Sequence, residues 1–177
     1  HSGHLFIEKK SAAEIAKEFG TPCYVYSKHS IEASFNRFKN AFAHRKNLIC
    51  YAVKANSNIA IINMLARLGS GFDIVSGGEL SRVIAAGGDP RKVVFSGVGK
   101  TKTEINYALK KGIKCFNIES ESELYRIAAV AKELNKDTNV SFRVNPDVDA
   151  KTHPYISTGL KENKFGVDVN DAPRLYQ

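Results

Sequence analysis

The sequence predicts an α/β protein, and more closely the first part of a (β/α)8 TIM-type barrel that is incomplete in this chain. Short apolar runs recur from Leu48 onward at intervals of 22 to 26 residues, and amphipathic segments with helical spacing fill most of the gaps. Polar or small residues follow most of these runs. Strands that alternate with helices indicate parallel strands joined by right-handed crossovers.

The first 47 residues predict two helices and one strand. A capping box of Ser11 with Glu14 opens a helix that Gly20 ends. Aromatic and β-branched residues predict a strand at Cys23–Tyr26. Apolar residues at helical spacing predict a second helix, and they are Ile31, Phe35, Phe38 and Phe42.

The repeating part begins with Leu48–Val53, an apolar run typical of a strand buried on both faces. Capping boxes of Thr101 with Glu104 and of Ser120 with Glu123 predict two of the later helix starts. Asn170 is expected to cap a final helix. The strand-like runs are centred near Ile49, Phe72, Val94, Phe116, Phe142 and Phe165.

Two other architectures also deserve comparison. A period in the low twenties fits leucine-rich repeats, but the Leu and Asn spacing of that solenoid is absent. An open doubly wound sheet stays open as an alternative, although no Gly-x-Gly-x-x-Gly follows the first strand. Six strand-like runs are fewer than a barrel needs, so the chain is expected to be a fragment of a longer protein.

Composition bounds the function. The 177 residues are 43% hydrophobic, which suffices for one domain with a core. Three cysteines beside apolar runs predict buried free thiols in a reducing compartment, and no segment resembles a membrane span or signal peptide, so we expect a cytoplasmic protein. The net charge of +8 is spread along the chain without a nucleic-acid recognition motif, which favours solvated helix faces.

Lys54 stands where the apolar run Leu48–Val53 gives way to a polar loop. In apolar surroundings a lysine is driven towards its neutral amine, which condenses with carbonyls. The simpler interpretation is that Lys54 caps the strand and extends to water. This stretch alone leaves both interpretations open.

Other polar residues also follow the predicted strands. In a parallel barrel the carboxyl ends of the strands converge on one face, where active sites are built. The sequence therefore predicts a cluster at this face, made of Lys54, Asp73, Ser96-Gly97, Glu119, Arg143 and Asn145.

Several ordered motifs resemble those of the alanine racemase-like, or fold type III, pyridoxal phosphate decarboxylases. Tyr51-Ala52-Val53-Lys54-Ala55-Asn56 is similar to the lysine motif of that family. Further segments resemble its diaminopimelate decarboxylase branch, and the similarity runs from about Leu5 to the end. These segments are residues 20–26, 72–80, 117–120, 143–146, 153–159 and 164–166.

The resemblance implies a role for each of three residues. Lys54 would hold pyridoxal 5'-phosphate covalently and act in catalysis, Asp73 would line the cofactor pocket, and Arg143 would lie under the cofactor. Arg143 has a second interpretation as a barrel-interior salt bridge with Asp73 or Glu119, and the two do not exclude each other. No metal is expected.

The sequence also gives expectations for other positions. Glu79 is either a further acid of the site or a first-turn glutamate favoured by the helix dipole. Gly77-Gly78 is interpreted as tight-turn geometry, and His153 as a structural histidine. Asn163 precedes Lys164 where the family more often has serine.

The resemblance also implies the activity of the full-length protein: decarboxylation of meso-2,6-diaminopimelate to L-lysine and CO2, the last step of lysine biosynthesis. Residues 1–28 would pack with a C-terminal β domain missing from this chain, and residues 29–177 would begin the cofactor-binding barrel. A homodimer is expected, and the fragment alone should be inactive. The alternatives are a related decarboxylase of ornithine, arginine or carboxynorspermidine, and a non-catalytic homologue that binds pyridoxal phosphate.

Overall fold

The computed structural model describes residues 3–145 and 165–176 of the chain. They fall into two compact units, His1–Asn47 and Leu48–Gln177. This division lies after the second helix, whereas the sequence led us to expect a boundary near residue 28. The packing of the first residues with a β domain stays a prediction.

The N-terminal unit holds a two-stranded antiparallel sheet and two helices. Its strands are β1 (Phe6–Ile7) and β2 (Lys10–Ser11), and its helices are α1 (Ala12–Phe19) and α2 (Lys28–Ala41). The predicted capping box of α1 is confirmed: the Ser11 hydroxyl accepts from the Glu14 amide at 3.2 Å, and the Glu14 carboxylate accepts from the Ser11 amide at 2.8 Å.

The predicted strand at Cys23–Tyr26 is wrong. These residues follow α1 without forming a ladder with any described segment, and the side chain of Tyr24 is 92% exposed. Aromatic and β-branched content favours extended backbone, but a strand also needs a hydrogen-bonding partner. Cys23 is exposed as well, contrary to the expectation of a buried thiol.

The second unit contains a five-stranded parallel sheet. Its strands pair in chain order, and they are β3 (Cys50–Ala52), β4 (Gly71–Ile74), β5 (Val93–Phe95), β6 (Cys115–Ile118) and β7 (Val140–Phe142). The helices between them are α3 (Ile59–Arg67), α4 (Gly77–Ala85), α5 (Lys102–Lys111) and α6 (Glu121–Glu133).

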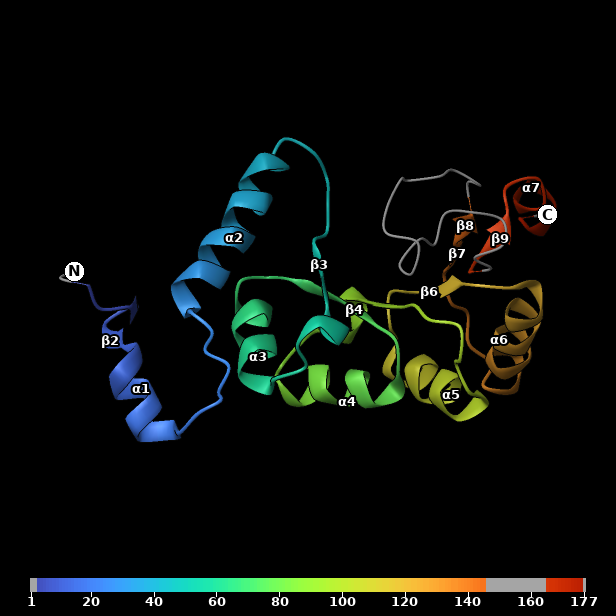
Figure 1. The fold of residues 1–177 in the computed structure, drawn as a ribbon. Helices are drawn as coiled ribbons and strands as arrows, with labels where there is room; N and C mark the ends of the chain where they lie inside the picture. Colours follow the sequence, from blue (N-terminus) through green and yellow to red (C-terminus); the bar gives the residue numbers. More distant parts are fainter. Residues whose placement is uncertain (1–2, 146–164, 177) are drawn as a thin grey trace. The chain divides into compact units, whose positions relative to one another are not determined.

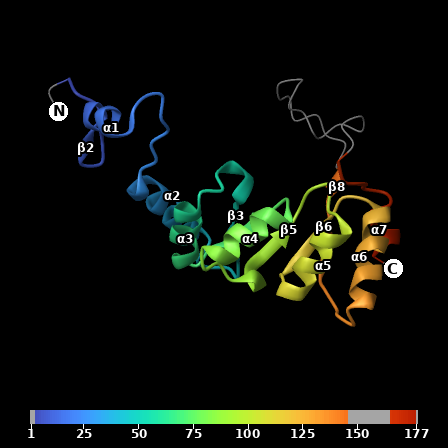
Figure 2. The ribbon, with the colours of Figure 1, turned by 90° about the horizontal axis from the view of Figure 1, so that it is seen from below.

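These helices follow one another along one side of the sheet (Figures 1 and 2). A doubly wound sheet would reverse its strand order and carry helices on both faces. The unbroken parallel order with one helical layer is that of a barrel, so the predicted fold class is confirmed for this part of the chain.

The chain continues the pattern beyond β7. Arg143 donates its amide to Ile118 of β6 at 2.9 Å, and its carbonyl accepts from Val167 at 2.8 Å. The segment β8 (Val144–Asn145) pairs in parallel with β9 (Val167–Asp168), near the sixth predicted run. The short helix α7 (Ala172–Leu175) has Asp171 at its N-cap.

Asn170 was predicted to be that cap, which is wrong by one residue. Its side-chain amide donates instead to the Asp168 carboxylate at 3.0 Å. The N-cap is Asp171 by its place in the backbone, and its side chain makes no capping hydrogen bond.

The core lies between the sheet and its helices. Alternate strand residues point into it and are fully buried: Phe72, Ile74, Val93, Phe95, Phe116 and Ile118. Helical side chains meet them there, among them Leu80, Val83, Ile105 and Ile127. β3 was expected to be buried on both faces, but its three residues are only half-buried, since within the described residues it pairs with β4 alone.

One predicted capping box is only half formed. The Ser120 hydroxyl accepts from the Glu123 amide at 3.3 Å, as predicted. The Glu123 carboxylate binds Lys100 and the Glu119 amide, and so it does not return to the backbone of Ser120. The box of Thr101 with Glu104 is complete and confirmed.

Glu104 also joins the starts of two neighbouring helices. One carboxylate oxygen accepts from the Thr101 amide at 3.0 Å, and the other accepts from the Gly77 amide of α4 at 2.8 Å. A Cβ at Gly77 would lie 2.9 Å from the Glu104 Cγ, so this contact needs glycine. Gly77-Gly78 therefore begins a helix, and the expected tight turn is wrong.

The pKa of Glu104 lies below its ordinary value, mainly because its carboxylate accepts from the Gly77 amide. The amide and hydroxyl of Thr101 lower this pKa by smaller amounts, and burial opposes the shift. A lowered pKa in the folded state gives stability that is present above the unfolded pKa, about 4.3, and is lost as the pH falls through the lower, folded value. We expect Glu104→Gln to reduce the free energy of unfolding at pH 7 by about 1 kcal/mol.

That difference should shrink on acidification, because protonated glutamate resembles glutamine. Urea unfolding of the full-length protein at several pH values measures it. Glu133→Gln, an exposed glutamate in a surface ion pair with Lys102, is the matched control and should change little. A deficit for Glu104→Gln that is independent of pH would contradict the assignment.

Candidate functional site

The carboxyl ends of the parallel strands form the candidate site. Lys54 lies in a short 3-10 helix, Val53–Ala55, directly after β3. Its side chain is exposed, and within the described residues its ammonium makes no hydrogen bond or ion pair. The part of the chain that the structure describes does not surround Lys54 with apolar side chains, and there the amine is open to a covalent partner.

Asp73 lies on β4 in register with Ala52 of β3, two residues before Lys54. It points away from the helices, since its neighbours Phe72 and Ile74 fill the core. The hydroxyl of Ser96, at the end of β5, donates to the Asp73 carboxylate at 2.5 Å. Asp73 is thus held in place at the polar face of the sheet.

The hydrogen bonds continue across the next two strands. The side-chain NH2 group of Asn117, on β6, donates to the Ser96 hydroxyl at 2.9 Å. The Ser141 hydroxyl of β7 donates to the side-chain carbonyl of Asn117 at 2.5 Å. All donors point the same way and end at the carboxylate of Asp73. Such a chain polarises its own bonds and fixes the orientation of its last acceptor.

Arg143 forms an ion pair with Glu119, at 3.2 Å between Nη1 and Oε2. The Glu119 side chain is only 4% exposed, and it also accepts from the Gly97 amide at 3.2 Å. The Arg143 side chain is 44% exposed, and the carbon of its guanidinium lies 5.5 Å from the centre of the Phe165 ring. Of the two acids considered from the sequence, Glu119 is the partner, and Asp73 is not.

Glu79 acts at the start of α4. Its carboxylate accepts from the Val75 amide at 2.7 Å, and its own amide donates to the Ser76 hydroxyl at 3.2 Å. These are the contacts of a first-turn glutamate that satisfies free amides at a helix start. The structure thus favours the helix interpretation.

Two half-buried cysteines share the polar face with Asp73. Burial raises the pKa of the Cys50 thiol, and the negative charge of Asp73 raises it further. Burial also raises the pKa of Cys115. A thiol with a raised pKa stays protonated at neutral pH and is a poor nucleophile, so neither cysteine competes with Lys54 for an electrophile.

These residues fit pyridoxal phosphate by their chemistry. An open lysine amine suits its aldehyde, while the carboxylate of Asp73, the guanidinium of Arg143 and the hydroxyl and amide groups of the sheet suit its polar ring substituents. No cluster of three or more metal-ligating side chains occurs among residues 3–145 and 165–176.

Residues 28–177 match the family model for the pyridoxal-binding domain of pyridoxal-dependent decarboxylases. The chain belongs to this family. The match includes the whole second unit and α2, so the expectation of a pyridoxal cofactor is confirmed at the level of the family.

Relatives in the decarboxylase family are similar along nearly the whole chain. Diaminopimelate decarboxylase of Pseudomonas aeruginosa is 59% identical over 97% of the chain, and that of Vibrio cholerae is 58% identical over 99%. The chain covers 41% and 42% of these relatives, so it spans about two fifths of their length.

Solved structures of the family agree in fold. Helicobacter pylori diaminopimelate decarboxylase complexed with L-lysine has a TM-score of 0.89 and 50% identity, covering 93% of this chain and 42% of its own. An arginine decarboxylase from Paramecium bursaria Chlorella virus has a TM-score of 0.75 but 22% identity, covering 93% of this chain and 44% of its own. At that identity only the fold is shared.

Part of the site was not predicted from the sequence. Lys100 and Ser141 were not singled out, and Asn117 was noted only within the segment 117–120. Nothing in the local pattern marks a lysine in the loop Gly97-Val98-Gly99-Lys100 as buried. Alternation along β6 and β7 was a usable signal, since Asn117 and Ser141 interrupt apolar runs on one face. His153 and Lys164 lie outside the described residues.

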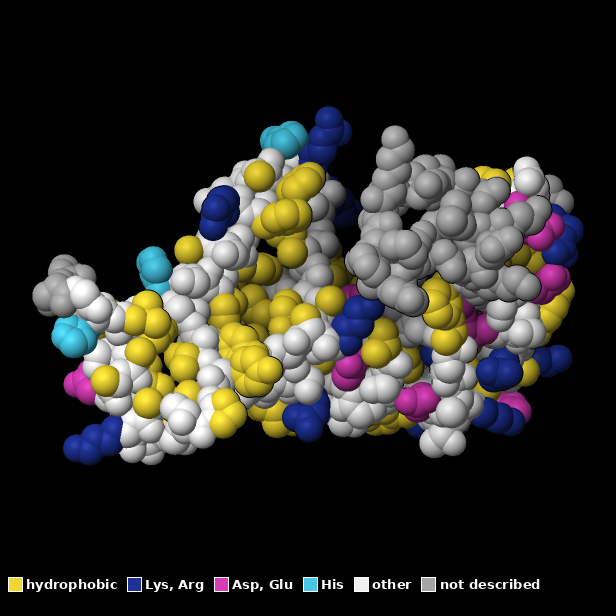
Figure 3. Space-filling view, in the orientation of Figure 1, with side chains coloured by type: hydrophobic (Ala, Val, Ile, Leu, Met, Phe, Trp, Pro, Cys, Tyr) yellow, Lys and Arg dark blue, Asp and Glu magenta, His cyan; other side chains and the backbone are white. Residues whose placement is uncertain are grey.

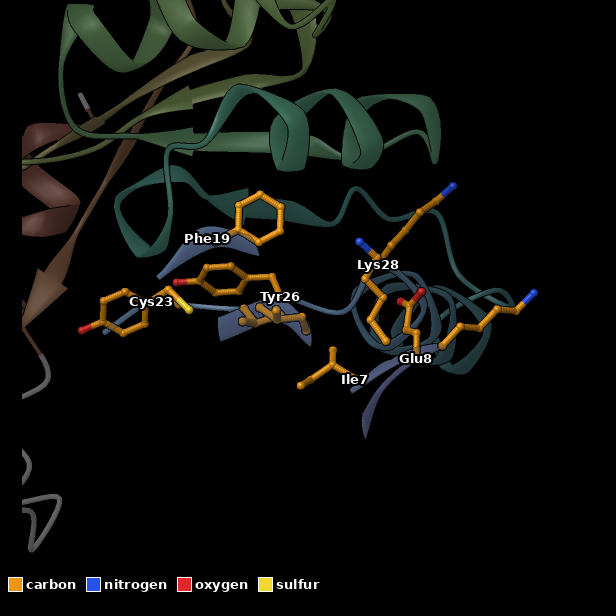
Figure 4. A pocket seen from close by; sticks show the side chains of 11 residues that line it. Ile7, Glu8, Phe19, Cys23, Tyr26 and Lys28 are labelled. Carbon is orange, nitrogen blue, oxygen red and sulfur yellow. The ribbon is translucent and has the colours of Figure 1, made fainter. Parts of the chain in front are cut away.

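The N-terminal unit has a hollow of its own, of about 650 Å3, shown in Figure 4. Apolar side chains line much of it, including Ile7, Phe19 and Tyr26. The carboxylate of Glu8 is occupied there, accepting from the Ser27 hydroxyl at 2.8 Å and the His29 amide at 2.9 Å. This hollow offers surface for packing and no evident catalytic set.

The surface of the second unit is mixed in charge. On the face shown in Figure 3, Lys and Arg side chains are interspersed with Asp and Glu side chains. The basic side chains of that face therefore form no single continuous patch. Among the described residues, no helix is both long enough and apolar enough to cross a bilayer.

Proposed function

We propose that the full-length protein uses pyridoxal 5'-phosphate to decarboxylate meso-diaminopimelate, releasing L-lysine and CO2. The observation that carries the proposal is the exposed amine of Lys54 at the carboxyl end of β3, beside the ordered carboxylate of Asp73. The relatives support the substrate, since those 58–59% identical to this chain are diaminopimelate decarboxylases.

Each candidate residue has its own task in this proposal. Lys54 binds the cofactor covalently. Asp73, oriented by Ser96, offers a fixed negative charge at the cofactor pocket, and Arg143, oriented by Glu119, offers a positive one. When bound, pyridoxal phosphate supplies the electron sink for the pair left behind as the carboxylate departs.

The rest of the protein completes the site. The chain spans about two fifths of its relatives, so we propose that a C-terminal β domain and a second subunit supply the remaining contacts. We also propose that residues 1–177 alone do not turn over substrate. Phe19 and Tyr24, 68% and 92% exposed, suit packing of residues 1–28 against that domain. A cytoplasmic homodimer fits this organisation.

Two measurements on the full-length protein test the proposal. Turnover is assayed with meso-diaminopimelate, ornithine, arginine and carboxynorspermidine, and we expect it only with the first. Borohydride reduction followed by peptide mapping should place the cofactor on Lys54. Turnover of another substrate in place of meso-diaminopimelate would contradict the proposed substrate. A protein that is labelled but turns over none of the four would be a non-catalytic homologue. A label on another residue would refute the role of Lys54.

A further inference from the structure

Lys100 is a buried lysine in the loop between β5 and α5. Its side chain is fully buried, and its ammonium pairs with the Glu123 carboxylate of α6 at 2.9 Å. It also donates to the carbonyl of Gly97 at 2.7 Å and to that of Asn117 at 2.8 Å. These three bonds use all three donors of the ammonium.

The loop that Lys100 holds carries the contacts of both candidate cofactor residues. Ser96 donates to Asp73, and the next amide, that of Gly97, donates to Glu119, which pairs with Arg143. Gly97 has a φ of +94°, a backbone conformation that residues other than glycine rarely adopt.

Lys100 is also linked to Ser96 and Glu119 through contacts with β6 and α6. It binds the main-chain carbonyl of Asn117, whose side chain donates to Ser96. Its partner Glu123 accepts from the Glu119 amide at 2.7 Å through its second oxygen. Both the Asp73 side and the Arg143 side of the site are thus tied to one buried ion pair.

We propose that Lys100, paired with Glu123, is a positioning residue for the binding of pyridoxal phosphate. It fixes the orientation of Asp73 through Ser96. It fixes the orientation of Arg143 through Gly97 and Glu119. The inference rests on the proposed function. A buried pair of this kind adds little net stability compared with apolar side chains, while removal of one partner leaves an unpaired buried charge. Stability and positioning are therefore separable by experiment.

The test uses the full-length apo protein and two double variants. Lys100→Met with Glu123→Leu removes the buried pair without leaving a lone charge. Lys102→Met with Glu133→Leu makes the same change in an exposed pair, 2.7 Å apart and 63% and 54% exposed, between the same two regions of the chain. Melting temperature and the dissociation constant of pyridoxal phosphate, titrated by absorbance, are measured for both.

We expect the Lys100/Glu123 variant to melt at a lower temperature, because the carbonyls of Gly97 and Asn117 and the amide of Glu119 each lose a partner, but to stay folded at 25 °C. Measured at 25 °C, it should bind pyridoxal phosphate at least about tenfold more weakly than the wild type, which is ~1.4 kcal/mol. The Lys102/Glu133 variant should bind as the wild type does. Wild-type affinity in the Lys100/Glu123 variant would overturn the inference, and so would an equal loss in both.

If the Lys100/Glu123 variant does not fold, Ser96→Ala decides. It leaves the ion pair intact and cuts only the link to Asp73, so wild-type affinity in Ser96→Ala would also overturn the inference. Failure of the proposed function looks different, because the wild-type protein itself would then carry no borohydride label on Lys54.

Discussion

Replacing Lys54 by alanine should lower kcat/KM of the full-length protein for meso-diaminopimelate by at least about 10³-fold. The side chain is exposed and makes no hydrogen bond or ion pair with the described residues, so its loss should not disturb the fold. What disappears is the amine proposed to bond the aldehyde of the cofactor. Steady-state kinetics and borohydride labelling of the variant measure both consequences.

Lys114→Ala is the matched control for Lys54→Ala. Lys114 is also exposed, but it precedes β6 and so lies at the amino end of the sheet, opposite the candidate site. Its replacement should leave kcat/KM and labelling unchanged. A Lys54→Ala protein that kept a tenth of wild-type turnover would exclude this lysine as the attachment point.

Phe116→Ala should destabilise the full-length protein by about 3–5 kcal/mol. Phe116 lies on β6 with no exposed surface, and its ring stacks on that of Phe95 with 5.8 Å between centroids. The truncation removes apolar contacts and leaves a cavity between the sheet and its helices, which a packed core fills only in part. Urea unfolding monitored by circular dichroism gives the change.

Tyr125→Ala removes an aromatic side chain of similar size from α6, where it is 65% exposed. Its effect on the free energy of unfolding should stay within about 0.5 kcal/mol. If both truncations had the same small effect, the position of the core between sheet and helices would be wrong.

The sequence predicted which polar residues gather at the site, but not which of them pair with one another. Lys54, Asp73, Glu119 and Arg143 were found because each follows an apolar run, and parallel strands bring their carboxyl ends together. Which acid Arg143 meets depends on the register of β6 with β7, and strand endings do not give that register. Tertiary pairing selected Glu119.

The carboxylate of Glu123 shows the same limit at a helix start. Its position three residues after Ser120 predicts a capping box, and its backbone follows that rule. Its carboxylate instead accepts from the buried ammonium of Lys100 and from the amide of Glu119. A charge in apolar surroundings needs a partner far more than an exposed helix start does.

The sequence by itself determined the succession of strands and helices, the face on which they gather polar side chains, and the lysine that stands first on that face. These follow from periodicity and chain direction, which are local properties. Only the tertiary structure decided that Lys100 is buried, that Ser96, Asn117 and Ser141 form one chain of hydrogen bonds to Asp73, and that residues 23–26 form no strand. The reason is physical: burial, hydrogen-bond partners and strand pairing depend on other segments of the chain, as in the bonds of Ser96 to Asp73 and of Lys100 to Glu123, each 23 residues apart.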